Sequence, residues 1–383
     1  MTDLDETART LRLALDEAAN RHQLSPGSWQ EIARRLHRQP LRRAAIAALI
    51  VSVVAASSLT AASYLRHKLG SSGAARGRSE QQLTVVSRLH LPGGGWDVAA
   101  GAGAVWIGGL GVTYKVDPAT GKITATVPTA GTDEFSRMAV GFGAVWITGG
   151  NRPGDHLGIL RISPADDRVT AFITMPDFGL PGAVAIADGR VWVGSDADGG
   201  SILRVDPHTN RVSGRPLRIG MDVGAIVPGA GALWVTHTNA GGSVTAINPS
   251  TGAISDLSSS AWHKVTAVET AGAGSLWMAG NNVIQRINPA SGRLTASITV
   301  RGAAQVISWV TFWHGSVWAI TSSGSGSGPA SIIRINPATD QVAGRPVVFG
   351  DTPAALTAGP TGLWAIDVTN TELVHLALRG TSG

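Results

Sequence analysis

Short apolar runs alternate with Gly-rich and Pro-containing turns from residue 82 onward, and a tryptophan recurs in the same kind of run seven times. A period of about 40–50 residues with several short strands is typical of one β-propeller blade. The pattern therefore predicts an all-β fold, a seven-bladed propeller of four-stranded blades over residues 82–380. The recurring residues are Trp106, Trp146, Trp192, Trp234, Trp277, Trp318 and Trp364, at spacings of 40, 46, 42, 43, 41 and 46 residues.

Two kinds of turn mark each repeat. A Gly-rich turn precedes the tryptophan, as in Gly101–Trp106 (GAGAVW), and an Asp/Asn-Pro turn follows it, as in Val116–Gly121 (VDPATG). At such a turn, Asp or Asn accepts backbone N–H bonds, Pro presets φ, and Gly takes the left-handed conformation. We therefore expect four strands per blade: a leads into the Gly turn, b carries the tryptophan, c ends at the Pro turn, and d follows it.

The seventh repeat ends early, because no Pro turn or strand d follows the apolar run 373–378. The segment 82–91, ahead of the first blade, has the alternation of a strand d. We predict that it completes the last blade and closes the ring, which removes open sheet edges.

The N-terminal region contains 22 uncharged residues, 44–65, enough at 1.5 Å per residue to cross a bilayer core of about 30 Å. The alternative is a cleaved signal peptide, since small residues occur at 61–63, but the 43 preceding residues far exceed a usual n-region. We expect a single-pass cell-membrane anchor with a cytoplasmic N-terminus and an extracytoplasmic propeller.

The segments beside this anchor have distinct patterns. Residues 1–43 show apolar residues at helical spacing, and an amphipathic segment over 4–38 is expected to form helices that could bind a cytoplasmic partner. Residues 66–81, rich in Ser, Gly and Ala, predict a flexible linker.

Charge argues against a nucleic-acid partner. The chain has a net charge of +5, yet residues 81–383 hold 19 basic and 19 acidic side chains. The excess lies beside the apolar segment, where basic residues meet anionic lipid headgroups. There are no cysteines, so Cys-ligated zinc is excluded.

The turn motifs carry a resemblance to a family. G-x-G-x-[VL]-W followed by R-[IV]-[DN]-P-x-[TS]-G resembles the extracytoplasmic propellers grouped with streptogramin (virginiamycin B) lyases and with YVTN or YncE-like repeat proteins. The turn at Asp117 is also similar to quinoprotein dehydrogenase repeats, although those have eight blades and adjacent cysteines. The resemblance covers 82–378 and implies the fold more than an activity.

For the lyases, the resemblance implies catalysis by a His and a Glu near the propeller axis with bound Mg²⁺. Their tryptophan strand commonly continues W-F-T-E, and no Glu follows the tryptophans here. His237 occupies such a position, but no matching His and Glu pair can be carried over. We therefore predict no cofactor or metal, with Mg²⁺ expected only if the chain is a lyase.

Candidate binding residues follow from propeller topology. The d–a and b–c connections emerge on one face and the a–b and c–d hairpins on the other. The first face receives the irregular, charged loops, and variable loops on a rigid scaffold commonly carry function. The candidates are Asp133, Glu134, Arg137, His156, Asp177, Asp196, Asp222, His237, Trp262, His263, Lys264 and Asp351.

Three classes of function remain open from sequence. The first is a membrane-anchored module that binds or senses an extracytoplasmic ligand or protein. The second is a streptogramin-lyase-like enzyme with an axial His and carboxylate, and the third is an inert envelope scaffold. The absence of the acid–base pair favours the binding module.

Overall fold

A computed structural model describes residues 82–151, 156–175, 181–195, 199–237, 243–258, 265–300, 305–323 and 328–379. The predicted cytoplasmic segment 1–43, anchor 44–65 and linker 66–81 lie outside these residues. Within the described residues, no helix has the length and apolar character needed to span a membrane.

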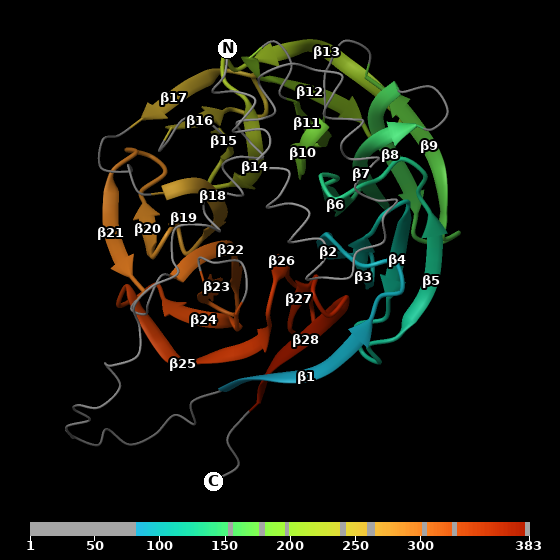
Figure 1. Cartoon of the computed structure of the whole chain (residues 1–383). Coiled ribbons are helices and arrows are strands. Elements are labelled where there is room, and N and C mark those ends of the chain that lie inside the picture. The colour runs from blue at the N-terminus through green and yellow to red at the C-terminus, as the bar shows by residue number, and fades with distance from the viewer. Residues whose placement is uncertain are drawn as a thin grey trace, which may run out of the picture. The chain divides into compact units, whose positions relative to one another are not determined.

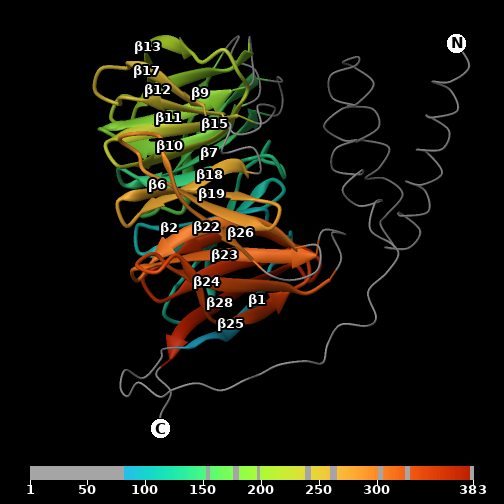
Figure 2. The ribbon, with the colours of Figure 1, turned by 90° about the vertical axis from the view of Figure 1, so that its left-hand side faces the viewer.

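The described residues form seven four-stranded antiparallel sheets arranged as blades around an axis (Figure 1). In every blade strand a is innermost and strand d forms the outer wall. In blades 1–6 the four strands follow chain order outward, and in blade 7 the outer strand is β1. Figure 2 shows the same ring from the side. The prediction of seven four-stranded blades is confirmed.

The strand bounds show the repeat directly. Blade 1 holds β2 (Asp97–Gly101), β3 (Ala104–Gly108), β4 (Val112–Val116) and β5 (Ile123–Pro128); blade 2 holds β6 (Met138–Gly141), β7 (Ala144–Asn151), β8 (His156–Ser163) and β9 (Arg168–Thr174); blade 3 holds β10 (Pro181–Ala187), β11 (Arg190–Ser195), β12 (Ser201–Asp206) and β13 (Arg211–Arg218). Blade 4 holds β14 (Val223–Gly229), β15 (Ala232–His237), β16 (Ser243–Ile247) and β17 (Ile254–Ser258); blade 5 holds β18 (Val265–Gly272), β19 (Ser275–Gly280), β20 (Val283–Ile287) and β21 (Leu294–Thr299). Blade 6 holds β22 (Gln305–Trp313), β23 (Ser316–Ser323), β24 (Ala330–Asn336) and β25 (Gln341–Gly350); blade 7 holds β26 (Pro353–Ala358), β27 (Leu363–Asp367), β28 (Glu372–Arg379) and β1 (Gln82–His90).

The turn chemistry explains the hairpins. In the a–b turn of blade 1, Ala102 and Gly103 have φ of 50° and 75°, and two central residues with positive φ match the twist of a tight hairpin. In the c–d turn, Oδ1 of Asp117 accepts the N–H groups of Ala119 and Thr120 at 2.9 and 2.7 Å. These bonds, foremost those from Thr120, lower the pKa of Asp117.

The repeated tryptophans are core residues, all at most 3% exposed. In blades 2–6 the indole N–H donates to the carbonyl five residues earlier, as from Trp277 to Gly272 at 3.0 Å. In most blades a cation from strand c lies over the ring, as with Arg286, 5.4 Å from the Trp277 centroid. Arg286 also donates to the Pro337 carbonyl in the c–d turn of the next blade at 2.8 Å. The Trp277–Arg286 pair thus connects blade 5 to blade 6.

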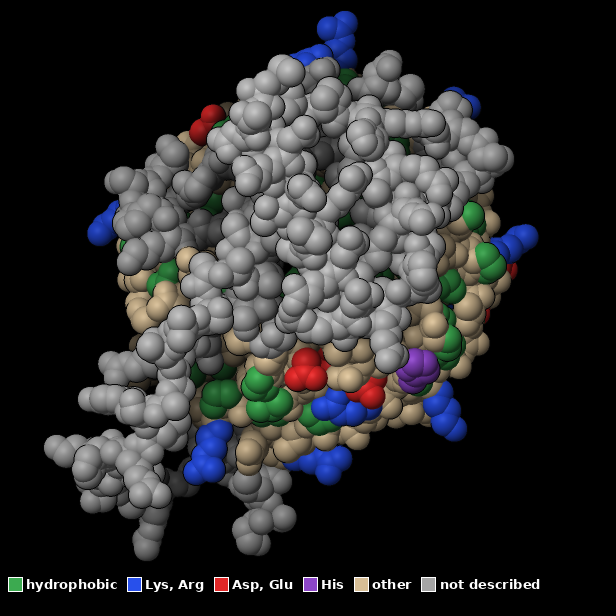
Figure 3. Space-filling model, in the orientation of Figure 1, with side chains coloured by type: hydrophobic (Ala, Val, Ile, Leu, Met, Phe, Trp, Pro, Cys, Tyr) green, Lys and Arg blue, Asp and Glu red, His purple; other side chains and the backbone are tan. Residues whose placement is uncertain are grey.

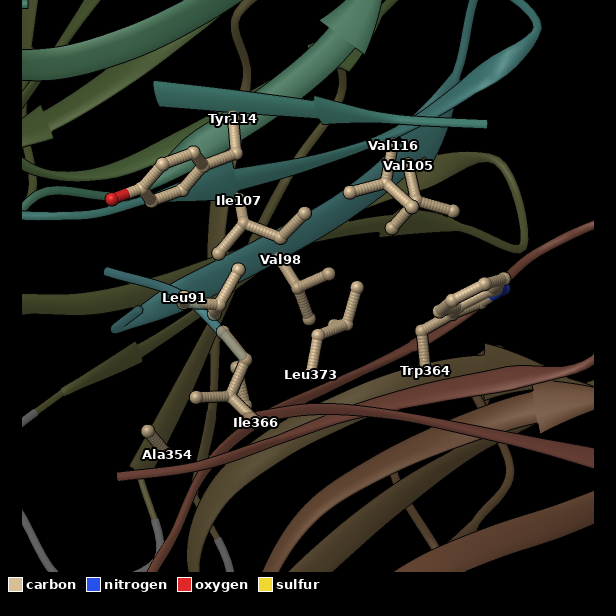
Figure 4. Packing of buried hydrophobic residues seen from close by; sticks show 11 residues of the cluster. Leu91, Val98, Val105, Ile107, Tyr114, Val116, Ala354, Trp364, Ile366 and Leu373 are labelled. Carbon is tan, nitrogen blue, oxygen red and sulfur yellow. The ribbon is translucent and has the colours of Figure 1, made fainter. Parts of the chain in front are cut away.

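The predicted exchange of the first strand is confirmed. β1 pairs with β28 from Gln82↔Arg379 to His90↔Glu372, so the N-terminal strand is strand d of blade 7. At this seam, Leu91 and Leu373 pack with residues of blade 1 in one buried cluster (Figure 4). The ring is therefore closed by chain segments from both ends of the domain.

Blade 7 departs from the cation pattern. His375 takes the place of the cation and stacks on Trp364, with ring centroids 3.9 Å apart and planes at 1°. Burial lowers the pKa of His375 from its ordinary 6.5, against a weaker opposing effect from the Thr361 main chain. The folded protein therefore holds this ring in its neutral form more strongly than the unfolded chain does.

We predict a loss of stability in acid from this residue. A lowered folded-state pKa means that its contribution is complete above the unfolded value and is lost as pH falls through the folded value. The measurement is denaturant unfolding of wild type and His375→Gln from about pH 8 to pH 5. The wild-type free energy of unfolding should drop relative to the variant in acid. Parallel pH profiles for the two proteins would contradict the assignment.

Candidate functional site

The d–a and b–c connections emerge together on one side of the ring, which we call the loop face. The a–b and c–d hairpins form the opposite turn face, as the strand order requires. Gln82 begins a strand d and Arg379 ends a strand c, and the two residues pair at the turn face. Both ends of the described domain therefore leave from the turn face, and the loop face carries no chain end.

Two loops of the loop face are joined by hydrogen bonds into one unit, which we call the Leu110–Phe135 platform (residues 109–111 and 129–137). Gly111 N–H donates to the Thr132 carbonyl at 3.0 Å, and Thr129 N–H donates to the Gly111 carbonyl at 2.9 Å. The Thr132 hydroxyl adds a bond to the Gly109 carbonyl at 3.1 Å. Since Thr129 and Thr132 are buried, these bonds are shielded from water.

The platform presents two large apolar side chains to solvent. Leu110 is 54% exposed and Phe135 is 66% exposed. The other large exposed hydrophobics among the described residues lie on outer strands or on an a–b turn. Both side chains are thus available to contact a partner on the loop face.

Three predicted candidates belong to this platform. Oδ1 of Asp133 accepts the Phe135 N–H at 3.1 Å and the Ser136 hydroxyl at 3.2 Å, so Asp133 shapes the loop. Arg137 is exposed and its Nη1 donates to the carbonyls of Glu134 and Ser136. Glu134 and Arg137 therefore place opposite charges in the same loop as Phe135.

Sequence reasoning missed Asp97, at the start of the innermost strand of blade 1. Its Oδ2 accepts the Met138 N–H at 2.8 Å, which fastens blade 2 to blade 1, and its Oδ1 accepts the Val98 N–H at 2.9 Å. Burial raises the pKa of Asp97, opposed by the charge of Arg137 and by these two bonds. Burial thus favours the protonated form of this carboxyl, although the residue keeps some exposed surface.

On blade 7, Asp351 is exposed and a second missed residue, Asp367, is buried. The Asp367 carboxylate accepts the N–H groups of Asp351 and Thr352 at 3.3 and 3.2 Å and the Asn370 amide at 2.6 Å. It thus fastens the d–a connection to the b–c connection. The repeat pattern of the sequence could have pointed to Asp367. The third residue after the repeated tryptophan is polar in four blades, and in the structure all four are buried: Ser195, His237, Thr321 and Asp367.

His237 occupies the same repeat position in blade 4 and is 3% exposed. Its Nδ1 lies 3.1 Å from the Asp222 carbonyl, and its Nε2 lies 3.0 Å from the Thr245 hydroxyl. Both ring nitrogens therefore have protein partners. Asp222 is the neighbouring predicted candidate, and its main chain, at the start of the blade, is what His237 contacts.

The remaining candidates are less defined. His156 begins strand β8, and nothing further is described for its side chain. Asp177, Asp196, Trp262, His263 and Lys264 lie outside the described residues. Among the described residues, acidic, basic and histidine side chains gather over β1 and β26–β28 (Figure 3), including the ion pair of Arg88 and Glu372 at 2.8 Å.

No cluster of three or more His, Asp or Glu side chains suited to a metal ion occurs within the described ranges. A groove of about 580 Å³ lies between the outer strands of blades 5 and 6, lined by Ile298 of β21, by Val300 just after that strand, and by Val342 and Pro346 of β25. It belongs to the outer wall and not to the loop face.

Known structures share this ring. Virginiamycin B lyase from Staphylococcus aureus matches with a TM-score of 0.62 and 17% identity, over 78% of this chain and all of that one. A streptogramin B lyase structure matches with a TM-score of 0.61 and 16% identity, over 78% of this chain and 98% of that one. The fold resemblance seen in the turn motifs is therefore confirmed for these lyases.

Proteins of other kinds share the same ring. Hydrazine synthase of Kuenenia stuttgartiensis matches with a TM-score of 0.61 and 11% identity, over 77% of this chain and 97% of that one. A family model described as a repeat of unknown function (DUF6923) matches residues 158–294, and no curated protein matches the sequence. One fold thus serves unrelated activities, and function must be argued from the site.

Proposed function

We propose that this chain is a binding module, anchored in the membrane by residues 44–65, whose loop face engages an extracytoplasmic ligand or protein. The observation that carries the proposal is the Leu110–Phe135 platform: two exposed apolar side chains on loops that are hydrogen-bonded to each other. A preformed surface loses little conformational freedom on binding, so apolar contact there contributes directly to affinity.

The placement of the chain ends supports the same proposal. Gln82, where strand β1 begins, lies at the turn face, opposite the loops that we propose bind a partner. Glu134 and Arg137, in the same loop as Phe135, supply charges that orient an incoming surface.

The test is site-specific photocrosslinking in the cells that produce the protein. We expect benzoylphenylalanine at positions 110 and 135 to give the same adduct, and benzoylphenylalanine at the exposed turn-face residue Ala119 to give none. Glu134→Lys should reduce the adduct several-fold, because a charge beside the contact acts mainly on association. Lys122→Glu, the matched reversal on the turn face, should leave it unchanged.

The result that would overturn the proposal is an adduct at Ala119 with none at positions 110 and 135. A lyase activity is the alternative, supported by the similarity in fold. A catalytically inactive variant of the staphylococcal lyase has been solved with quinupristin, so quinupristin is the probe. Conversion of quinupristin by the full chain, if lost on changing a loop-face residue, would show that the chain is an enzyme and not a binding module.

A further inference from the structure

In two blades the cation that covers the repeated tryptophan is neutralised by the next blade. Nζ of Lys115 donates to Oδ1 of Asp167 at 2.7 Å, and Nη1 of Arg286 donates to Oδ1 of Asp340 at 3.1 Å. Each cation also donates to the carbonyl of the proline three residues before that Asp, at 2.7 and 2.8 Å. The c–d turn of one blade thus supplies a carboxylate to the strand-c cation of the blade before it.

Blade 3 has the cation, but blade 4 has no carboxylate to offer it. Arg204 on β12 pairs with Trp192, and its guanidinium carbon lies 5.9 Å from the ring centroid. In the next turn, Gly252 is the residue three positions after the proline, where the other turns have Asp167 and Asp340. All three have a left-handed backbone, with φ of 75°, 50° and 52°. Blade 4 therefore keeps the turn and lacks the carboxylate.

The surroundings leave the guanidinium of Arg204 without a counter-charge. Within the part of the chain that the structure describes, its Nε is buried and has no hydrogen-bond partner, and its guanidinium forms no ion pair. The acidic residue of its own strand, Asp206, lies 3.6 Å from Arg190 and accepts N–H groups of its turn.

Two glycines flank the two outer nitrogens of this guanidinium. A methyl group at Gly252 would lie 3.9 Å from Nη1 of Arg204, and a methyl group at Gly214 would lie 2.7 Å from Nη2. Arg204 also keeps part of its surface exposed. The nitrogens therefore lie beside backbone that carries no side chain.

We propose that Arg204 binds an oxyanion, a carboxylate or phosphate group, where the Asp167 and Asp340 carboxylates meet their cations in the other blades. A guanidinium stays charged at any physiological pH, and a buried charge without a partner is costly. Its planar fork of N–H donors matches two oxygens of a carboxylate or phosphate. We call Arg204, Gly214 and Gly252 the Arg204 site.

The outer wall beside the Arg204 site favours an anion as well. Strand β13, which contains Gly214, carries Arg211, Arg215 and Arg218 and no acidic residue. Their positive potential raises the local concentration of anions. The site lies at the interface of blades 3 and 4, near the c–d turns of the turn face. The inference is therefore independent of what the loop face binds.

The test is titration of the full chain with inorganic phosphate and with acetate, at constant ionic strength set by chloride. Nitrogen-15 spectra report the Nε–H groups of arginine, and Arg204→Lys identifies the Arg204 signal by its loss. We expect this signal to shift and to saturate. The signal of Arg286 should stay in place, because its Nε already donates to the Ser275 hydroxyl and its Nη1 to Asp340. The anion that saturates the shift at the lower concentration identifies the ligand as a phosphate or a carboxylate.

Gly252→Asp tests the position of the anion. The new carboxylate would take the place that Asp340 has beside Arg286, so the saturable shift of the Arg204 signal should be lost. The matched control is Gly292→Asp in the next turn. It faces Ala246, which pairs with Trp234 where the other blades have a cation, and it should leave the shift unchanged.

Three results would overturn the proposal. The first is an Arg204 signal that does not saturate with either anion, and the second is an equal shift of the Arg204 and Arg286 signals, which would be a general effect of salt. The third is a saturable shift that persists in Gly252→Asp. The comparison of Arg204 with Arg286 uses the wild-type chain, so it decides the matter even if Gly252→Asp does not fold.

Discussion

Deletion of residues 82–91 is expected to destabilise the whole propeller by several kcal/mol, a large share of the roughly 5–15 kcal/mol that holds a typical domain. The segment supplies the outer strand of blade 7 and pairs with β28 along its full length. It also buries Leu83 and Leu91, which are 5% and 0% exposed. Its loss opens a sheet edge and frees the two ends of the ring at once.

Denaturant unfolding of the full chain measures this effect. The control is a deletion of equal length, residues 70–79, which lies upstream of β1 and leaves its pairing intact. The control should unfold at the wild-type midpoint. An 82–91 deletion with the wild-type midpoint would mean that β1 is dispensable for ring closure.

Trp277→Ala is expected to cost about 3–5 kcal/mol, the range for truncating a large buried aromatic. Trp277 is 0% exposed and packs with residues of blades 5 and 6 in one cluster. Its N–H bond to Gly272 and its contact with Arg286 are lost with the ring. Arg286, which also reaches the next blade through the Pro337 carbonyl, loses its aromatic support.

The measurement is again the free energy of unfolding, with Trp96→Ala as the matched control. Trp96 precedes strand β2, is partly exposed, and lies outside the repeated position. Trp96→Ala should lower the free energy of unfolding clearly less than Trp277→Ala does. Equal losses for the two variants would show that burial at the repeated position does not set the energetic role of these tryptophans.

Much of the fold could be predicted because its signals are local or periodic. The turn at Asp117 is set by bonds within four residues, and the positive φ of Gly103 belongs to a two-residue hairpin. The pairing of β1 with blade 7 could also be predicted. The seventh repeat lacks a strand d, and the segment before the first blade has the pattern of a strand d with no repeat of its own. The family resemblance agreed with this fold.

From the sequence, the candidate site could be predicted only as one face of the ring and not as a set of contacting residues. Asp133, Glu134 and Arg137 do lie on the loop face, but the platform depends on Leu110, which is apolar and lay outside a search for charged loops. His237 was predicted as a candidate binding residue of the loop face. In the structure it is buried, and both of its ring nitrogens lie at hydrogen-bond distance from protein groups.

By itself, the sequence determined the number of blades, the turn types, the ring closure and the face that carries the irregular loops, because each follows from spacing or from contacts between near neighbours. The tertiary structure alone decided which loops brace each other and which side chains join across strands. Asp97 meets Met138 across 41 residues, and Thr132 meets Gly109 across 23. Such contacts arise from the docking of blades and strands in space, and no local pattern in the chain encodes them.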